Sequence, residues 1–289
     1  MIYRMLALNV DGTLLQTNGR LNKSTKEAIQ YAQSKGIYVT IVSSKHFLAV
    51  KRIAKSLKID NHLVTHQGAY IASELEKPIF VRRLSDQTVR DLVQLIDSYP
   101  CQIRLIHEKH ALATNPEKSK PLLAKSIFTP AISFFYSIKY TDTILEDLET
   151  QPMDACQLEI AFHSKKDLHE CRRMVENSFH EVDCVLSNDH QLHIVPKGIS
   201  KLRGLMYLCD RLGMTMSEVV MIGSGLDDQP CIECSGLGVA MGDAPQEVKR
   251  SADWITRSAD ENGVAYVVKE LFRKQQPIEF LKKLNVIKK

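Results

Sequence analysis

The sequence has no apolar run long enough to cross a membrane, and its start lacks the apolar segment that is typical of a secretory signal. It also has no block of five or more like charges, no internal repeat and no low-complexity segment. These absences argue against a membrane protein and against a dedicated nucleic-acid binder. A net charge of +4 remains compatible with small anionic ligands. We therefore expect a cytoplasmic protein with neither membrane nor nucleic-acid partners.

A regular cysteine or histidine framework is also missing. The seven cysteines are an odd number at irregular spacing, which fits a reducing compartment. Cys231 and Cys234 form a C-x-x-C pair, but neither a second such pair nor a suitable histidine pair accompanies them, so we interpret both as buried packing residues. Seven histidines lack metal-ligand spacing, and we interpret them as surface or strand residues, one or two of which could face the cleft: His107, His110, His163, His169, His180, His190 and His193.

Strands and helices alternate at both ends of the sequence. Near the start, residues 1–10 and 37–44 read as strands, and the helix between them begins with a possible capping box of Ser24 and Glu27 and ends at Gly36. The same alternation returns after Pro196. Such an order predicts an α/β fold with a doubly wound parallel sheet. With 289 residues and 44% hydrophobic content, two domains are expected.

The middle of the sequence has a different texture. Between residues 83 and 191, helical segments and paired strands follow one another without regular alternation, and "PEKSKP" at 116–121 reads as a polar turn. We therefore predict a discontinuous core, residues 1–82 and 192–289, interrupted by an inserted α+β cap, residues 83–191.

Four polar segments fall at the carboxyl ends of predicted core strands. They are Asn9-Val10-Asp11-Gly12-Thr13, Ser43-Ser44-Lys45, "KGISK" at 197–201 and "GSGLDD" at 223–228. Ligands of open parallel sheets bind beyond the carboxyl ends of the strands. These segments are therefore the candidates for a common site.

In order and spacing, the four segments resemble the haloacid dehalogenase superfamily, specifically its Cof-type phosphatases with an inserted C2-type cap. The segments "GLGVAMGDAPQEVKRSADWIT" and "DENGVA" extend the resemblance along the chain. The resemblance implies that sugar phosphates or similar small phosphorylated metabolites are the substrates. In active members an aspartate attacks phosphorus, and an acid/base aspartate follows two residues later. Mg²⁺ is held by the nucleophile, a main-chain carbonyl and an aspartate of a "GDxxND" loop.

Several positions keep the family pattern. The resemblance assigns Asp11 to the acid/base position and its carbonyl to the metal, Ser43 to the phosphoryl-binding hydroxyl, and Lys201 to the balancing lysine. The positive charge of the lysine is needed because the transferring phosphoryl group is anionic. The expected phosphate-binding residues are Thr13, Ser43, Ser44, Lys45 and Lys201.

Other positions depart from that pattern. Asn9 stands in the nucleophile's place and Ser224 in the place of the metal-binding aspartate. Asp227 replaces the family's asparagine, while Asp228 keeps its aspartate, and these two could take over metal binding in part. Gln67 stands where many relatives have asparagine. We expect Mg²⁺ binding to be weak or absent.

Each of these residues also has a purely structural interpretation. Asp11 could serve a turn, Ser43 a helix cap, and Lys201 an exposed helix face. Asp227 and Asp228 could simply favour the start of a helix.

Three functions stay open at this point. The first is a catalytically impaired protein that binds phosphate esters or phosphate, since an amide is a poor nucleophile. The second is an active Mg²⁺-dependent hydrolase of small phosphorylated metabolites. The third is a regulatory protein whose fold serves as a surface for a protein partner, which the sequence does not identify.

Overall fold

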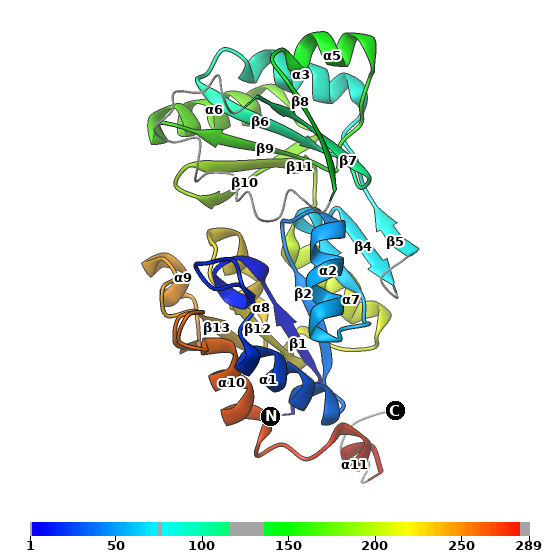
Figure 1. Ribbon diagram of the computed structural model, residues 1–289, viewed down its shortest axis with the longest axis vertical. Helices are drawn as coiled ribbons and strands as arrows, with labels where there is room; N and C mark the ends of the chain where they lie inside the picture. Colours follow the sequence, from blue (N-terminus) through cyan, green and yellow to red (C-terminus); the bar gives the residue numbers. More distant parts are fainter. Residues whose placement is uncertain (1, 74–76, 116–135, 284–289) are drawn as a thin grey trace.

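The computed structural model describes residues 2–73, 77–115 and 136–283, which form two β-sheets stacked end to end (Figure 1). The first sheet has eight strands in the spatial order β14 (Trp254–Ile255), β13 (Leu237–Ala240), β12 (Val219–Gly223), β1 (Met5–Leu8), β2 (Tyr38–Val42), β3 (Leu63–Thr65), β4 (Tyr70–Ser73) and β5 (Lys77–Val81). The second has six, in the order β10 (Val182–Asn188), β11 (Gln191–Pro196), β9 (Gln157–Phe162), β6 (Cys101–Ile106), β7 (His110–Thr114) and β8 (Ser137–Thr141).

Burial on both faces explains why the first sheet is largely parallel. Along β1, Leu6 and Leu8 pack into one apolar cluster, while Met5 and Ala7 pack into another on the opposite face. The helices over the first face are α1 (Lys23–Ser34), α2 (Phe47–Leu57), α10 (Gly263–Phe272) and α11 (Ile278–Lys283). Those over the second are α7 (Lys201–Arg211), α8 (Gln229–Cys234) and α9 (Gln246–Arg250). The predicted α/β fold is confirmed, with β4 and β5 added as an antiparallel edge.

The start of α1 differs from the prediction. The N-cap is Asn22, whose side chain accepts a hydrogen bond from the Ser24 N–H at 3.0 Å, so the predicted capping box of Ser24 and Glu27 is wrong. Gly36, at φ +79°, follows the helix end as expected.

The second sheet and its helices are called the cap below. Leu158 and Ile160 of β9 pack into the cap's apolar cluster, which α3 (Asp86–Ile96), α5 (Ile144–Thr150) and α6 (Lys165–Ser178) complete. Figure 1 shows these helices over the outer face of the sheet, and the opposite face turns toward the first sheet. The expected boundary at residue 192 falls inside β11, which pairs with β9 and β10 and therefore belongs to the cap sheet up to Pro196.

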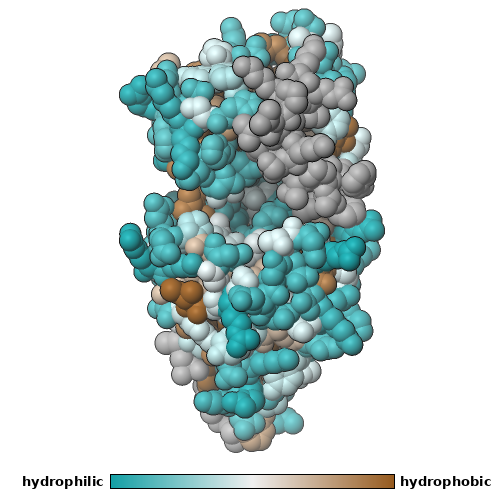
Figure 2. Space-filling view, turned by 60° about the vertical axis from the view of Figure 1, so that its left-hand side comes forward, coloured by the Kyte–Doolittle hydropathy of each residue, from teal (hydrophilic) through white to brown (hydrophobic). Residues whose placement is uncertain are grey.

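The face of the molecule drawn in Figure 2 has no large apolar patch among the described residues. On the face drawn in Figure 2 hydrophilic residues predominate over both sheets, and hydrophobic ones form only small groups. Within the described ranges, no helix is both long and apolar enough to cross a membrane. The predicted polar turn at 116–121 lies outside the described residues. Of the C-x-x-C pair, Cys231 is buried as predicted, but Cys234 is exposed.

Candidate functional site

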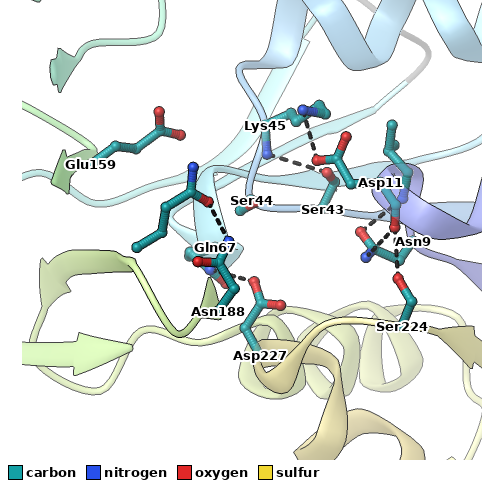
Figure 3. A network of polar contacts seen from close by, with 12 residues as sticks. Asn9, Asp11, Ser43, Ser44, Lys45, Gln67, Glu159, Asn188, Ser224 and Asp227 are labelled. Carbon is teal, nitrogen blue, oxygen red and sulfur yellow. Dashed lines mark hydrogen bonds and ion pairs between the residues drawn. The ribbon is translucent and has the colours of Figure 1, made fainter. Parts of the chain in front are cut away.

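The candidate site lies at the carboxyl ends of β1, β2 and β12. These three strands are parallel neighbours, so the loops that follow them meet at one edge of the sheet. The turn η1 (Val10–Leu14) follows β1, and the turn η4 (Leu226–Asp228) follows β12. Figure 3 shows Asp11 between Asn9 and Ser224 on one side and Ser43 and Lys45 on the other.

The side chain of Asn9 is buried and fully engaged. Its Oδ1 accepts a hydrogen bond from the Val10 N–H at 2.7 Å, and its Nδ2 donates to Asp228 Oδ2 at 2.6 Å. Because a main-chain N–H can only donate and a carboxylate can only accept, these partners fix the orientation of the amide. The residue in the nucleophile's place therefore directs an N–H at a carboxylate.

Ser224 occupies the second departing position and bridges the two loops. Its hydroxyl donates to the main-chain carbonyl of Asp11 at 2.8 Å, which is the atom that the resemblance assigns to the metal. Gly12 permits this approach, since its φ is +63° and a Cβ there would lie 2.6 Å from Ser224 Oγ. A hydrogen bond thus joins the two loops.

Lys201 forms the buried charge centre of the site. Its Nζ lies 2.8 Å from Asp227 Oδ2 and 2.7 Å from Asp228 Oδ1, and its side chain is 1% exposed. Burial disfavours the ammonium, but the two carboxylates outweigh burial and raise the pKa of Lys201. Lys201 is therefore charged and buried, so the interpretation as an exposed helix face is wrong.

The carboxylates of Asp227 and Asp228 also accept hydrogen bonds from N–H groups of the two loops and of Gln67. Asp228 Oδ2 also accepts from the main-chain N–H groups of Ser224 and Gly225, each at 2.9 Å. Asp227 Oδ2 accepts from Gln67 Nε2 at 2.6 Å. Together with the contacts of Asn9 and Lys201, these bonds engage both carboxylate oxygens of Asp228 and the Oδ2 of Asp227.

These observations decide whether the donor set fits Mg²⁺. Mg²⁺ requires oxygen ligands and normally at least one carboxylate in its first coordination shell. Here the Asp11 carbonyl accepts from Ser224, and Asp227 and Asp228 share the single ammonium group of Lys201. Among the described residues, no group of three or more His, Cys, Asp or Glu side chains is placed to hold a metal ion. The residues present do not fit a Mg²⁺ site.

The phosphoryl-binding candidates lie on the other side of Asp11. Ser43 is buried, and its Oγ accepts from the Lys45 N–H at 3.2 Å, while His46 is the N-cap of α2, so Ser43 is not the helix cap. Lys45 Nζ lies 2.7 Å from Asp11 Oδ2, whose side chain is 51% exposed. An ion pair with such an exposed partner contributes at most about 1 kcal/mol. An anionic ligand can therefore compete for Lys45 at little cost.

Two other predicted phosphate-binding residues have different environments. Thr13 is buried, and its Oγ1 has no hydrogen-bond partner. Ser44 contributes its main-chain carbonyl, which accepts from Gln157 Nε2 of the cap strand β9 at 2.8 Å. The structure thus brings all of the predicted site residues to one end of the sheet.

Sequence reasoning did not place the cap residues Gln157 and Glu159 at this site. It named His193 only among seven histidines, one or two of which were expected to face the cleft. Gln157 and Glu159 alternate with Leu158 and Ile160 along β9, and this period of two is the signal that could have found them. His193 lies opposite Glu159 on β11. Burial is the main cause that lowers the pKa of His193. The positive charges of Lys201 and Lys45 lower this pKa further, whereas the negative charges of Glu159 and Asp227 raise it. The ring is therefore close enough to the core residues to interact with their charges.

Comparisons with known proteins agree with this arrangement. The chain matches the haloacid dehalogenase-like hydrolase family over residues 6–268. It is 44% identical to the stress response protein YhaX of Bacillus subtilis, over 98% of both chains, and 26% identical to the putative phosphatase YkrA of the same organism, over 93% of this chain and 97% of the relative. A haloacid dehalogenase-like hydrolase from Bacteroides thetaiotaomicron superposes with a TM-score of 0.76 at 25% identity, covering 93% of this chain and all of that one. The chain therefore belongs to the haloacid dehalogenase-like hydrolase family, as its strand-end segments implied.

Proposed function

We propose that this protein binds a phosphate ester or inorganic phosphate and that its catalytic activity is strongly impaired. The observation that carries the proposal is the pair of hydrogen bonds made by the two departing residues, from Asn9 to Asp228 and from Ser224 to the Asp11 carbonyl. They hold together, without a cation, the loops that a cation would otherwise join.

The chemistry of Asn9 supports the impairment. A carboxamide is a poor nucleophile toward phosphorus, and loss of an attacking group in a hydrolase costs roughly 10⁶-fold in turnover, or about 8 kcal/mol in activation free energy. In addition, the Nδ2 of Asn9 is held by Asp228 and its Oδ1 by Val10. No group at this position can attack.

The charge of the pocket supports binding. Compared with an intact relative, neutral groups replace two expected carboxylates at Asn9 and Ser224, and Asp227 adds one carboxylate where the family has asparagine. The net change is the loss of one negative charge, while Lys45 and the Ser43 hydroxyl remain. A phosphoryl group can accept hydrogen bonds from these groups with no metal between them. The proposal therefore includes weak or absent Mg²⁺ binding.

Isothermal titration with inorganic phosphate and with a hexose phosphate, each with and without Mg²⁺, tests the proposal. We expect binding that does not depend on Mg²⁺ and that is weakened about tenfold or more by Lys45→Met, because a charge-assisted hydrogen bond is lost. Lys55→Met, at an exposed position of α2, is the matched control and should leave binding unchanged. If the protein binds neither inorganic phosphate nor the hexose phosphate, the proposal is contradicted.

A second candidate function is an active phosphatase of small phosphorylated metabolites. The name of the relative YkrA, a putative phosphatase, favours it, and so does the half-exposed carboxylate of Asp11 in the acid/base position. It predicts turnover that rises with Mg²⁺ and disappears on Asp11→Ala. A regulatory role is in keeping with the name of YhaX, a stress response protein.

A further inference from the structure

A cavity lies beside the edge strand β10, outside the candidate site. It has a volume of about 620 Å³ and is enclosed by the end of α6, the first residues of β10 and residues 197–200. The segment 197–200, called the connector below, leads from the cap into α7. The residues that line the cavity are different from those of the candidate site. The volume suits a small organic molecule, because ligand pockets usually measure about 300–1,000 Å³.

One part of the cavity wall is apolar. Phe179 and Val182 pack in the apolar cluster of the cap, and Val185 and Ile199 pack in a small cluster that joins residues of both sheets. Phe179 and Val185 are only half-buried, so a ligand seated against them removes apolar surface from water. This part of the wall favours a ligand with an apolar body.

The other part of the wall carries two ion pairs, whose formal charges cancel. Lys197 Nζ lies 2.7 Å from Asp183 Oδ1, and the Gly198 N–H donates to Asp183 Oδ2 at 2.7 Å, so both oxygens of Asp183 are engaged. Arg172 Nε donates to Glu176 Oε1 at 2.7 Å. Within the described ranges, the terminal nitrogens of Arg172 have no protein partner. Unused hydrogen-bond donors therefore exceed unused acceptors.

This surplus of donors favours an anionic group. The terminal N–H groups of Arg172 form a planar fork that matches a carboxylate, and the ammonium of Lys197 has N–H groups beyond the one that Asp183 accepts. Both cations are partly exposed, at 36% for Arg172 and 64% for Lys197, so their ion pairs contribute little and both can contact an anion. The nearby carboxylates of Glu176 and Asp183 disfavour a doubly charged phosphate. The polar part of the wall therefore favours a carboxylate.

Two segments connect the cavity to the candidate site. The first residues of β10 line the cavity, while β10 also packs against η4, and Figure 3 shows its last residue, Asn188, near Asp227. The connector ends at Ser200, which lines the cavity and directly precedes Lys201. A ligand that shifts β10 or the connector therefore acts on residues of the candidate site.

We propose that the cavity binds a small organic carboxylate with an apolar body and that its occupation changes the affinity of the candidate site for phosphate. Binding in the cavity is independent of the proposed function, whereas the effect on phosphate rests on it. Such coupling is reciprocal, since each ligand must change the affinity for the other by the same factor.

Isothermal titration of the full-length chain with hexanoate, acetate, hexylamine and 1-hexanol tests the ligand class. Hexanoate has both the anionic group and the apolar body. Acetate lacks the apolar body, hexanol lacks the charge, and hexylamine has the opposite charge. We expect hexanoate to bind about tenfold or more tightly than each of the other three. Equal affinity for all four probes, or no binding of hexanoate, overturns the inference.

Three variants assign the binding to the cavity. Arg172→Met should weaken hexanoate binding about tenfold or more, because the guanidinium fork is lost. Arg173→Met, at the next and exposed position of α6, is the matched control and should keep the wild-type affinity. Lys45→Met removes the cation of the candidate site and should leave hexanoate binding unchanged. Loss of hexanoate binding in Lys45→Met, with binding retained in Arg172→Met, would place the carboxylate in the candidate site and overturn the inference.

Titration of inorganic phosphate with and without saturating hexanoate tests the coupling. We expect the affinity for phosphate to change about fivefold or more, and we expect no such change in Arg172→Met, whose affinity for phosphate alone should stay within about twofold of the wild type. An unchanged affinity in the wild type overturns the coupling alone. A change that persists in Arg172→Met reflects competition at the candidate site and also overturns the coupling.

The same titrations separate this inference from the proposed function. Absence of phosphate binding in both conditions overturns the proposed function and the coupling. The hexanoate titrations decide the binding step in either case, because they do not require phosphate.

Discussion

At the scale of single residues, the site differs from an intact relative in two neutral side chains that make specific new contacts. The amide of Asn9 donates to Asp228, and the hydroxyl of Ser224 donates to the Asp11 carbonyl. Restoring a carboxylate at either position would remove a donated hydrogen bond and add a negative charge beside existing ones. We therefore expect the present sequence to fold without a cation, and a restored carboxylate to lower the free energy of unfolding when no cation is present.

The substitution Asn9→Asp tests this argument through stability. We expect the free energy of unfolding to fall by about 1–3 kcal/mol without Mg²⁺, because the new carboxylate faces Asp228 in a buried site. In the double variant N9D/S224D, Mg²⁺ should restore about 2–3 kcal/mol once its concentration is a hundredfold above its dissociation constant. Urea denaturation with and without Mg²⁺ measures both effects. Equal stabilisation of the wild type by Mg²⁺ would refute the argument.

Lys201 provides a second test at this scale. The substitution Lys201→Met leaves Asp227 and Asp228 buried without their cation, and loss of one partner of a buried ion pair costs about 3–5 kcal/mol. Lys197→Met removes an exposed lysine four residues earlier and should leave the free energy of unfolding nearly unchanged. Thermal or urea unfolding compares the two variants. Similar losses in both would show that the buried triad does not stabilise the fold.

At the scale of elements, the helix starts show what the sequence could and could not predict. The spacing of apolar residues predicted the alternating strands and helices of the core, because the buried face of each element determines where its apolar residues recur. The caps were harder to predict, since several polar residues compete at each start. Asn22 rather than Ser24 caps α1, and His46 caps α2 by accepting from the Leu48 N–H at 3.1 Å.

His46 makes the start of α2 sensitive to pH. Its Nδ1 accepts from Leu48, so its Nε2 must carry the proton and donate to the His107 carbonyl of the cap at 3.0 Å. Burial is the main cause that lowers the pKa of His46, to about 4 from an ordinary 6.5. Protonation would abolish the acceptor that caps the helix.

The sign of the pH dependence follows from this lowered pKa. Because the unfolded chain binds the proton more readily, the contribution of His46 to stability is fully present above about pH 6.5 and is lost as pH falls toward 4, by roughly 3 kcal/mol. The variant His46→Asn keeps a capping oxygen that does not titrate. Urea denaturation between pH 4 and 7 should give a shallower pH dependence for His46→Asn than for the wild type. An identical slope would contradict the assignment.

At the scale of the whole molecule, the sequence predicted which segments meet at the site but not the contacts between them. Parallel order places Asn9, Ser43 and Ser224 at one edge, because neighbouring strands share their carboxyl ends. The pairing of Lys201 with Asp227 and Asp228 depends on side-chain geometry. The cap residues depend on how two sheets face each other, which periodicity alone does not determine.

The measurement that tests the central claim most directly is the turnover of p-nitrophenyl phosphate in the presence of Mg²⁺. The wild type and N9D/S224D are compared, and N9D/S224D/D11A serves as the control that removes the acid/base candidate. The account predicts that turnover of the wild type is close to background and that of N9D/S224D is several orders of magnitude higher. Rapid, Mg²⁺-dependent turnover by the wild type would contradict it.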